Sequence, residues 1–151
     1  MPAILFVCTA NICRSPMAMA IFIRKISNPS GWRIESAGTW AIDGLPAAKY
    51  TQIVADEYGI NLTEHLSRQV TLDILSQFNL IVTMEKNQKE ALQNEFKQFS
   101  ERIYYLSEII GGSFDIKDPV GGSIEEFYDT AREIDNIFTR GWGKIMELLT
   151  V

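Results

Sequence analysis

Near the amino terminus, a short segment combines a nucleophile with a cation: Cys8-Thr9-Ala10-Asn11-Ile12-Cys13-Arg14-Ser15-Pro16. An apolar run at residues 3–7 precedes it, and an amphipathic run follows it. Only five residues separate Cys8 from Arg14, so the chain can curl around a small tetrahedral anion with its backbone N–H groups pointing inward. The pattern predicts a strand, a phosphate loop (residues 8–14) and the start of a helix.

The chemistry expected of this loop is nucleophilic attack on phosphorus. Cys8 should be a thiolate at neutral pH, because it lies beside an arginine, under several N–H donors and at a helix N-terminus. The planar guanidinium of Arg14 can bind two phosphate oxygens at once, and these become the equatorial oxygens during in-line displacement. Taken singly, Cys8 is more simply a core cysteine and Arg14 a surface charge. Together with the strand and the helix start, they favour catalysis.

Ser15 and Pro16 indicate where the helix after the loop begins. Serine is a favoured N-cap residue, and proline suits the first helical position because the N–H that it lacks has no partner there. With Ser15 as the cap, the positive end of the helix dipole points into the loop. This placement stabilises a thiolate or a bound oxyanion.

The motif C-T-A-N-I-C-R-S-P-M-A resembles the signature of the low-molecular-weight protein tyrosine phosphatases, which carry C-x5-R-S near the N-terminus. Residues 36–39 (S-A-G-T), residues 65–69 (H-L-S-R-Q) and Asp118-Pro119 are also similar to family patterns. The resemblance covers nearly the whole chain and implies one phosphatase domain over residues 1–151. It implies hydrolysis of phosphotyrosine in proteins through a phosphocysteine, with the catalytic residues Cys8, Arg14 and Asp118.

In the expected mechanism, Cys8 attacks phosphorus while Asp118 protonates the leaving oxygen, and Asp118 then deprotonates the water that releases phosphate. Asp115 is the rival acid on position alone, and only the resemblance of Asp-Pro to the family pattern decides between them. No metal or other cofactor is expected. The residues expected to bind the substrate are Thr9, Ala10, Asn11, Ile12, Cys13, Ser15 and Trp40.

Two residues of the loop region are expected to support Cys8. Asn11 tolerates a left-handed backbone conformation better than most residues, which suits a tight loop. The hydroxyl of Ser15 can donate to the Cys8 sulfur and stabilise it as a leaving group. Cys13 lies across the short loop from a reactive thiolate, as expected of a resolving cysteine that forms a reversible disulfide with Cys8. The alternative is that Cys13 only packs beneath the loop.

His65 and Trp40 each have two interpretations. His65, the only histidine, could act as a base for Cys8. By resemblance it is a supporting residue that holds neighbouring loops, through Ser36 or Glu85. Trp40 lies in the loop that leaves the carboxyl edge of the second predicted strand, where ligands bind in open α/β sheets. It either stacks on an aromatic substrate or covers the hydrophobic core.

The rest of the chain alternates between strand and helix patterns, with predicted strands at residues 3–7, 33–37, 80–84 and 103–106. Predicted helices follow the phosphate loop, open at Pro46 and close at Gly59, run from Thr71 to residue 75, and cover residues 86–96. A long last helix begins at Ser123, in a capping box with Glu126, and Gly141 and Gly143 leave open whether it bends or ends there. This alternation of strands and helices predicts an α/β fold, with a single-domain four-stranded parallel sheet flanked by helices.

Glycine pairs bracket the segment that carries Asp118, here named the acid loop (residues 111–122). A loop hinged on glycines at both ends can move, which suits a lid that brings an acid to the substrate.

Composition limits the other possibilities. The chain has 151 residues, 46% hydrophobic and 22% charged, which is typical of one globular domain. A net charge of -5 argues against nucleic acid as a partner, and the first apolar run is too short for a signal peptide or membrane insertion. Two cysteines and one histidine cannot build a four-ligand zinc site. We expect a cytoplasmic monomer with reduced thiols.

The substrate prediction depends on the residues after Asp118-Pro119 and on Ile12. After Asp-Pro the chain has Val120-Gly121-Gly122-Ser123, where eukaryotic members of the family place aromatic residues that sandwich the phosphotyrosine ring. This pattern resembles bacterial members that include protein-arginine phosphatases, which carry a threonine at the position of Ile12. A threonine hydroxyl can engage a phosphoguanidinium N–H, whereas Ile12 leaves that N–H unpaired and packs against an aryl ring. The prediction is therefore phosphotyrosine, with phosphoarginine as the alternative.

Two further alternatives belong to other classes of protein. A thiol-dependent arsenate reductase needs additional cysteines further along the chain, and there is none after Cys13. A non-catalytic phosphate-binding module has little use for a carboxylate such as Asp118 beside a dianion. Both alternatives are disfavoured.

Overall fold

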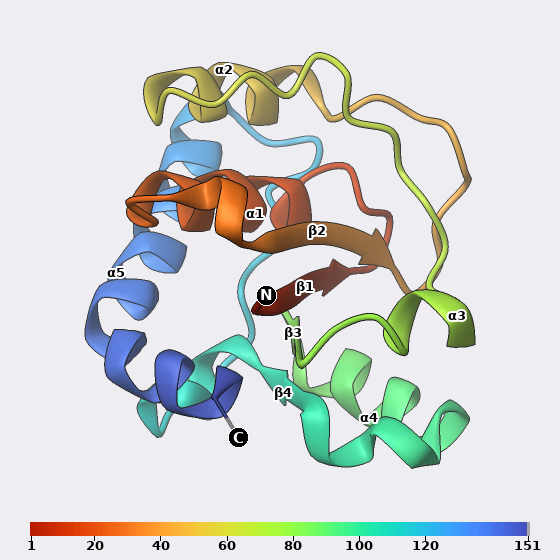
Figure 1. Ribbon diagram of the computed structural model, residues 1–151. Helices are drawn as coiled ribbons and strands as arrows, with labels where there is room; N and C mark the ends of the chain where they lie inside the picture. The colour runs from red at the N-terminus through yellow and green to blue at the C-terminus, as the bar shows by residue number, and fades with distance from the viewer. Residues whose placement is uncertain (151) are drawn as a thin grey trace.

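The computed structural model describes residues 1–150 and contains one sheet with helices on both faces (Figure 1). The strands are β1 (Ala3–Cys8), β2 (Arg33–Gly38), β3 (Leu80–Thr83) and β4 (Ile103–Tyr105). All neighbouring strands are parallel, in the order β2-β1-β3-β4. The predicted α/β fold with four parallel strands is confirmed.

All of the α-helices except the last lie between strands in the chain order. The α-helices are α1 (Arg14–Lys25), α2 (Lys49–Glu57), α3 (Leu72–Leu75), α4 (Lys86–Glu95) and α5 (Ile124–Leu149). Short 3-10 helices form at η1 (Pro29–Gly31), η2 (Lys97–Arg102) and η3 (Leu106–Ile110). Within residues 1–150, none of the helices combines the length and the apolar character needed to cross a bilayer.

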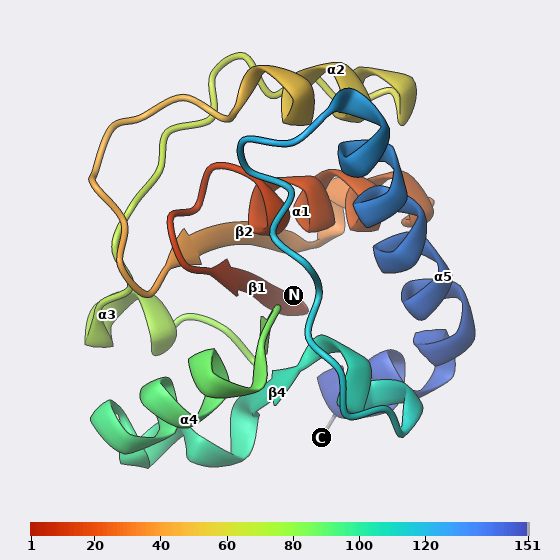
Figure 2. The same ribbon diagram turned by 180° about the vertical axis from the view of Figure 1, so that it is seen from behind.

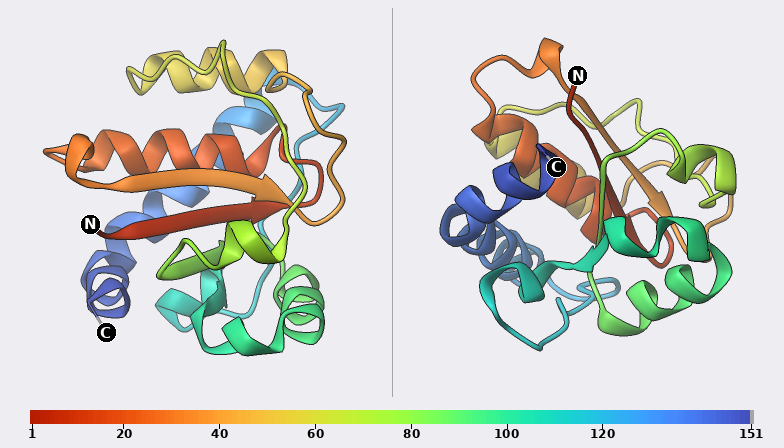
Figure 3. Two further views of the ribbon diagram at one scale, coloured as in Figure 1. Left: turned by 45° about the vertical axis from the view of Figure 1, so that its right-hand side comes forward. Right: turned by 60° about the horizontal axis from the view of Figure 1, so that its bottom comes forward.

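The central strands are buried on both sides, so alternate side chains enter two separate cores. On one side, the ring of Phe6 lies 5.5 Å from the rings of Phe22 in α1 and Phe138 in α5, between centroids. On the other side, Leu5 belongs to the core that contains Leu92 of α4. Helices α1 and α5 therefore cover one face, and α3 and α4 cover the other (Figure 3).

The strand order places a functional edge at the carboxyl ends of β1 and β3. The chain leaves β1 toward β2 on one side and later crosses to β3 on the other. Loops that diverge at such a reversal are where ligands bind in open α/β sheets. The acid loop runs from η3 to the start of α5 and passes the loop after β1 (Figure 2), where Asp118 lies 3.7 Å from Arg14.

Helix α1 begins earlier than its sequence pattern indicates. Its first residue is Arg14 and its N-cap is Cys13, so the prediction of Ser15 as the cap and Pro16 as the first residue was wrong. Pro16 is still tolerated, because the first four N–H groups of a helix have no partner within it. The positive end of the helix dipole still faces the phosphate loop.

Helix α2 begins later than predicted, at Lys49 rather than at Pro46. The residues before it contact the phosphate loop instead, and the N–H of Ala48 donates to the carbonyl of Ile12 at 2.9 Å. Gly59 follows the helix with a φ of 76°, as expected of a glycine that closes a helix.

Helix α5 is continuous through both of its glycines and ends at Leu149. A Cβ on Gly141 would lie 2.9 Å from Cγ2 of Ile109, so the glycine permits close packing of α5 against η3. Ser123 is the N-cap, and its Oγ accepts from the N–H of Glu126 at 3.3 Å. The side chain of Glu126 makes no return bond within residues 1–150, so only half of the predicted capping box forms.

Candidate active site

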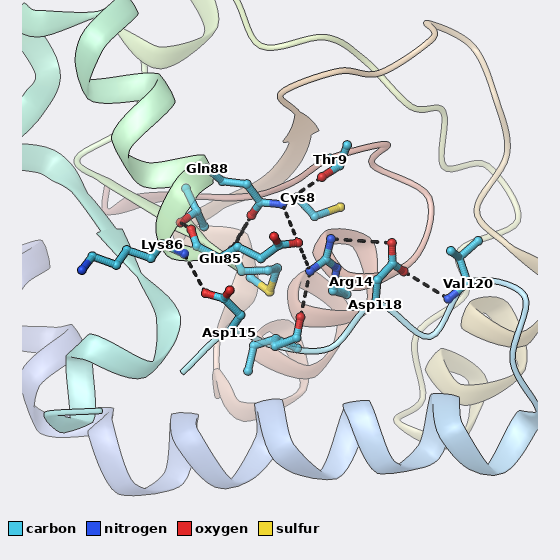
Figure 4. Close-up of polar contacts among 12 residues, drawn as sticks. Cys8, Thr9, Arg14, Glu85, Lys86, Gln88, Asp115, Asp118 and Val120 are labelled. Atoms are coloured by element: carbon cyan, nitrogen blue, oxygen red, sulfur yellow. Dashed lines mark hydrogen bonds and ion pairs between the residues drawn. The ribbon is translucent and has the colours of Figure 1, made fainter. Parts of the chain in front are cut away.

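Cys8 and Arg14 face the same small cavity, of about 60 Å³, at the carboxyl edge of the sheet (Figure 4). Cys8 is the last residue of β1 and Arg14 the first of α1, and they are 3% and 2% exposed. The structure therefore brings together the predicted nucleophile, clamp and acid. The residues that line the cavity are Cys8, Ala10, Ile12, Cys13, Arg14, Asp118 and Val120.

Asn11 holds the phosphate loop in shape. Its φ of 61° is the only positive value at a non-glycine position in residues 1–150, which confirms the predicted left-handed conformation. Its side chain is fully buried, and the amide nitrogen donates to the hydroxyls of Ser15 at 2.8 Å and Ser36 at 2.9 Å. Its amide oxygen accepts from the N–H of Arg68 at 3.0 Å. One side chain thus ties the loop to two other segments.

The hydroxyl of Ser15 lies 3.0 Å from the sulfur of Cys8. Asn11 already donates to this hydroxyl oxygen, so the proton of Ser15 points elsewhere. Its two acceptors are the Cys8 sulfur at 3.0 Å and the carbonyl oxygen of Ala37 at 3.4 Å, and the sulfur is the nearer. A thiolate at Cys8 can only accept, so Ser15 is then the donor. This geometry supports the role predicted for Ser15.

His65 contacts the phosphate loop through its backbone. Its Nε2 lies 2.8 Å from the carbonyl oxygen of Asn11. A carbonyl only accepts, so Nε2 carries the proton. Burial lowers the pKa of His65, the bond to Asn11 opposes this, and the charge of Arg68 lowers the pKa further, so the net direction is down. His65 is therefore a neutral donor at pH 7. Its predicted partners, Ser36 or Glu85, were wrong, because within residues 1–150 these bind Asn11 and Arg14 instead.

Arg14 is oriented by a carboxylate and a backbone carbonyl. Its Nη1 donates to Oε2 of Glu85 at 2.5 Å and to the carbonyl of Ile116 at 2.8 Å. Both hydrogens of Nη1 are thereby used, which leaves Nε and Nη2 for two oxygens of a phosphate. Sequence reasoning missed Glu85 as the partner of Arg14, although its position just after β3 at the binding edge was a usable signal.

The two candidate acids have different surroundings. Asp118 lines the cavity, with Oδ2 3.7 Å from Nη2 of Arg14 and a side chain 41% exposed. Asp115 instead accepts from the N–H of Lys86 at 2.9 Å, at the first residue of α4. It thus pairs an otherwise unpaired N–H of that helix. The geometry favours Asp118 as the acid.

The apolar wall of the cavity comes from Ile12 and Val120. Trp40 is not among the lining residues and is 83% exposed, so the interpretation that it covers the core was wrong. Its backbone N–H donates to the carbonyl of Thr9 at 2.9 Å, which keeps its loop beside the site. Stacking of Trp40 on a substrate stays a prediction.

Cys13 also faces the cavity and is 4% exposed. Burial, followed by the negative charges of Asp118 and Cys8, raises the pKa of Cys13 to about 12. Its thiol is therefore protonated at neutral pH. Both cysteines are free thiols in the structure.

Two further residues that contact the phosphate loop had no role assigned from the sequence. Gln88 of α4 donates to the hydroxyl of Thr9 at 3.0 Å, and nothing in the sequence indicates this contact. Gly38 ends β2 where a Cβ would lie 2.4 Å from the carbonyl oxygen of Thr9. Its place in the S-A-G-T stretch was the available signal.

The acid loop is anchored at its centre. Gly111 and Gly121 have φ values of 77° and 78°, so glycines do form both turns. Between them, the N–H of Ile116 donates to the carbonyl of Met84 at 2.9 Å, and Ile116 also accepts from Arg14. The predicted lid movement stays a prediction, and Asp118 lies on the part of the loop beyond this anchor.

The chain is similar to several known phosphatases. Residues 3–145 match the family model described as low molecular weight phosphotyrosine protein phosphatase. A protein-arginine-phosphatase of Bacillus subtilis is 32% identical over 137 residues, 89% of this chain and 90% of that protein. A low molecular weight protein-tyrosine-phosphatase of Staphylococcus haemolyticus is 36% identical over 87% of this chain and 91% of its own length. The solved structure of the low molecular weight protein tyrosine phosphatase from T. tengcongensis has a TM-score of 0.86 and 32% identity, covering 97% of this chain and 99% of that one.

Proposed function

The chain belongs to the low molecular weight phosphotyrosine protein phosphatase family, and on that premise we propose that it hydrolyses phosphotyrosine in proteins with Cys8 as the nucleophile. The family makes it a hydrolase with a cysteine-based mechanism. The observation that carries the residue assignment is the shared cavity of Cys8, Arg14 and Asp118. We assign one catalytic domain to residues 1–151.

The proposed reaction has two steps. Nε and Nη2 of Arg14 and the loop N–H groups bind the phosphate oxygens while the Cys8 sulfur attacks phosphorus. The bond from phosphorus to the phenolic oxygen breaks, and Asp118 gives that oxygen its proton. Asp118 then takes a proton from the water that attacks the phosphocysteine, and Ser15, 3.0 Å from the sulfur, stabilises the departing thiolate.

The substrate preference follows from the apolar wall. Ile12 lines the cavity beside Cys8, and Val120 lines it beside Asp118. An aryl ring packs against these side chains, whereas a phosphoguanidinium would place an N–H against Ile12 without a partner. An unpaired buried polar group costs about 1–3 kcal/mol, enough for roughly 5- to 150-fold discrimination. The alternative is phosphoarginine, because two relatives carry the name protein-arginine-phosphatase.

The test compares kcat/KM for phosphotyrosine and phosphoarginine peptides in the wild type, Ile12→Thr and Ile12→Val. Valine has the shape of threonine without its hydroxyl, so it controls for the lost volume. We expect the wild type to favour phosphotyrosine, Ile12→Thr to shift the ratio toward phosphoarginine, and Ile12→Val to leave it nearly unchanged. A wild type that favours phosphoarginine would overturn the substrate and leave the mechanism standing.

Phosphoproteins are the partners that the family implies. We infer that the enzyme works in the cytoplasm, because a cysteine nucleophile and a second free thiol need a reducing compartment. We propose, separately, that it is a monomer. Light scattering of the purified protein across micromolar concentrations tests the monomer, and a mass twice that of the chain would contradict it.

A further inference from the structure

We propose that Gln88 is a positioning residue that fixes the nucleophile and the arginine clamp relative to each other, an inference that rests on the proposed function. Gln88 lies in the first turn of α4 and is 4% exposed. The mechanism above makes no use of it. Its side chain nevertheless contacts both Thr9 of the phosphate loop and Glu85, the partner of Arg14 (Figure 4).

The carboxamide of Gln88 uses its full hydrogen-bonding capacity. Its Oε1 accepts from the N–H groups of Met84 and Glu85, both at 3.0 Å. Its Nε2 donates to the hydroxyl of Thr9 at 3.0 Å and to Oε2 of Glu85 at 3.4 Å. Because Oε1 must face two donors, the amide cannot flip. Nε2 is therefore held toward Thr9.

One of the two groups that Nε2 contacts adjoins the nucleophile, and the other orients the arginine. Thr9 directly follows the nucleophile Cys8. Oε2 of Glu85 is the oxygen that holds Nη1 of Arg14 at 2.5 Å. One buried amide thus connects the segment that carries the sulfur to the carboxylate that orients the guanidinium. A change in the distance between the Cys8 sulfur and the Arg14 guanidinium would weaken every state in which a phosphate is bound between these two groups.

Gln88 also has an ordinary structural role, and different atoms carry the two roles. Its Oε1 pairs N–H groups at the start of α4, which affects stability wherever the helix lies. Its Nε2 reaches the phosphate loop. Removing the hydroxyl of Thr9 abolishes the positioning contact and leaves the helix cap intact, so Thr9→Val separates the two roles.

The experiment is a double-mutant cycle with Gln88→Met and Thr9→Val, measuring kcat/KM for an aryl phosphate and the inhibition constant of inorganic phosphate. Each single variant should lower kcat/KM by about 5- to 10-fold, the size expected for one hydrogen bond, and should weaken phosphate binding. The kcat/KM of the double variant should be no lower than that of the more impaired single variant, because both substitutions remove the same contact. Thermal unfolding should show a loss of stability for Gln88→Met and little change for Thr9→Val.

Gln93→Met is the matched control. Gln93 lies on the same helix, and its amide donates to the carbonyl of Ser100 at 3.1 Å, away from the phosphate loop. We expect its kinetics to equal those of the wild type.

Losses in kcat/KM that multiply in the double variant would overturn the inference. A Thr9→Val enzyme as active as the wild type would also overturn it, and this result can be measured even if Gln88→Met fails to fold. A wild type without activity on any aryl phosphate would instead contradict the proposed function.

Discussion

At the scale of single residues, the site is defined by the donors that remain after each group has bound its neighbours. Nη1 of Arg14 is fully occupied by Glu85 and by the carbonyl of Ile116, so only Nε and Nη2 are left for phosphate. The amide of Asn11 occupies the oxygen of Ser15 and leaves the proton of Ser15 for the Cys8 sulfur. Each reactive atom is thus oriented by a group that does not itself react.

The first prediction concerns the nucleophile. Cys8→Ser should abolish turnover and leave binding of a phosphate ester largely intact, because the loop N–H groups and Arg14 still hold the anion while a hydroxyl is a poor nucleophile. Turnover is measured with an aryl phosphate, and binding by calorimetry with the same ester. Turnover close to that of the wild type would remove Cys8 from its assigned role.

A second prediction separates the two aspartates. Asp118→Asn should slow hydrolysis by about 10²- to 10⁴-fold for phenolic groups that need a proton, and by less for a nitrophenolate. Asp115→Asn is the matched control, since its amide oxygen can still accept from the N–H of Lys86, and its rates should stay near those of the wild type. If Asp115→Asn shows the larger loss, the acid is Asp115.

A third prediction concerns oxidation of the site. Peroxide should give a reversible disulfide between Cys8 and Cys13, which face one cavity. Because the pKa of Cys13 is raised to about 12, its attack on oxidised Cys8 requires an unfavourable deprotonation and should accelerate as the pH rises. Mass spectrometry after mild oxidation at pH 7 and pH 9 measures this, with Cys13→Ser as the control. Sulfinylated Cys8 beside free Cys13 at both pH values would contradict it.

At the scale of elements, the phosphate loop depends on close approach of the strand beside it. A Cβ at Gly38 would lie 2.4 Å from the backbone oxygen of Thr9, and a backbone atom cannot move aside as a flexible side chain can. The end of β2 therefore has to be glycine for the loop after β1 to keep its path.

The fourth prediction tests this contact. Gly38→Ala should displace the phosphate loop, destabilise the protein by about 1–3 kcal/mol, and lower kcat/KM. Gly31→Ala is the control, because a Cβ there would meet nothing within 4 Å. Urea unfolding and steady-state kinetics are measured on both variants. Equal effects at the two positions would show that the contact with Thr9 is unimportant.

At the scale of the whole molecule, His65 links stability to pH. The pKa of His65 is lowered in the folded protein, so the unfolded chain takes up a proton first as the pH falls below about 6.5. The unfolded state then binds more protons, and the free energy of unfolding decreases as the pH falls, until it passes the folded pKa.

The fifth prediction follows from that linkage. Between pH 7.5 and pH 5.5, the wild type should lose more stability than His65→Gln, whose amide can still donate to the carbonyl of Asn11 but does not titrate. Urea unfolding at each pH gives the difference. Identical pH slopes in the two proteins would remove His65 as the source. Glu35 affects stability only at more acidic pH. Burial raises its pKa, but hydrogen bonds from Arg33 and Arg68 outweigh this effect and hold the pKa below its usual value.

The sequence by itself determined those features whose causes are local. Cys8, Asn11 and Arg14 lie within seven residues, so residue types and spacing alone predicted the phosphate loop and the left-handed Asn11. Strand and helix periodicity predicted four parallel strands, because each pattern reports burial along one short segment. The resemblance to the family added Asp118, which no local pattern distinguished from Asp115.

Only the tertiary structure decided what surrounds the loop. The bonds from Arg14 to Glu85, from Gln88 to Thr9 and from His65 to Asn11 join residues 71, 79 and 54 positions apart. The first two exist because the strand order places the end of β3 next to β1, and the third because the segment that carries His65 runs beside the end of β2, where Gln69 pairs with Gly38. Periodicity reports which faces are buried but not which segments are neighbours. Contact with the phosphate loop also decided the start of α2. The N–H of Ala48 donates to the carbonyl of Ile12, and the helix begins at Lys49 rather than at Pro46, because a bond to the rest of the fold outweighs a local preference.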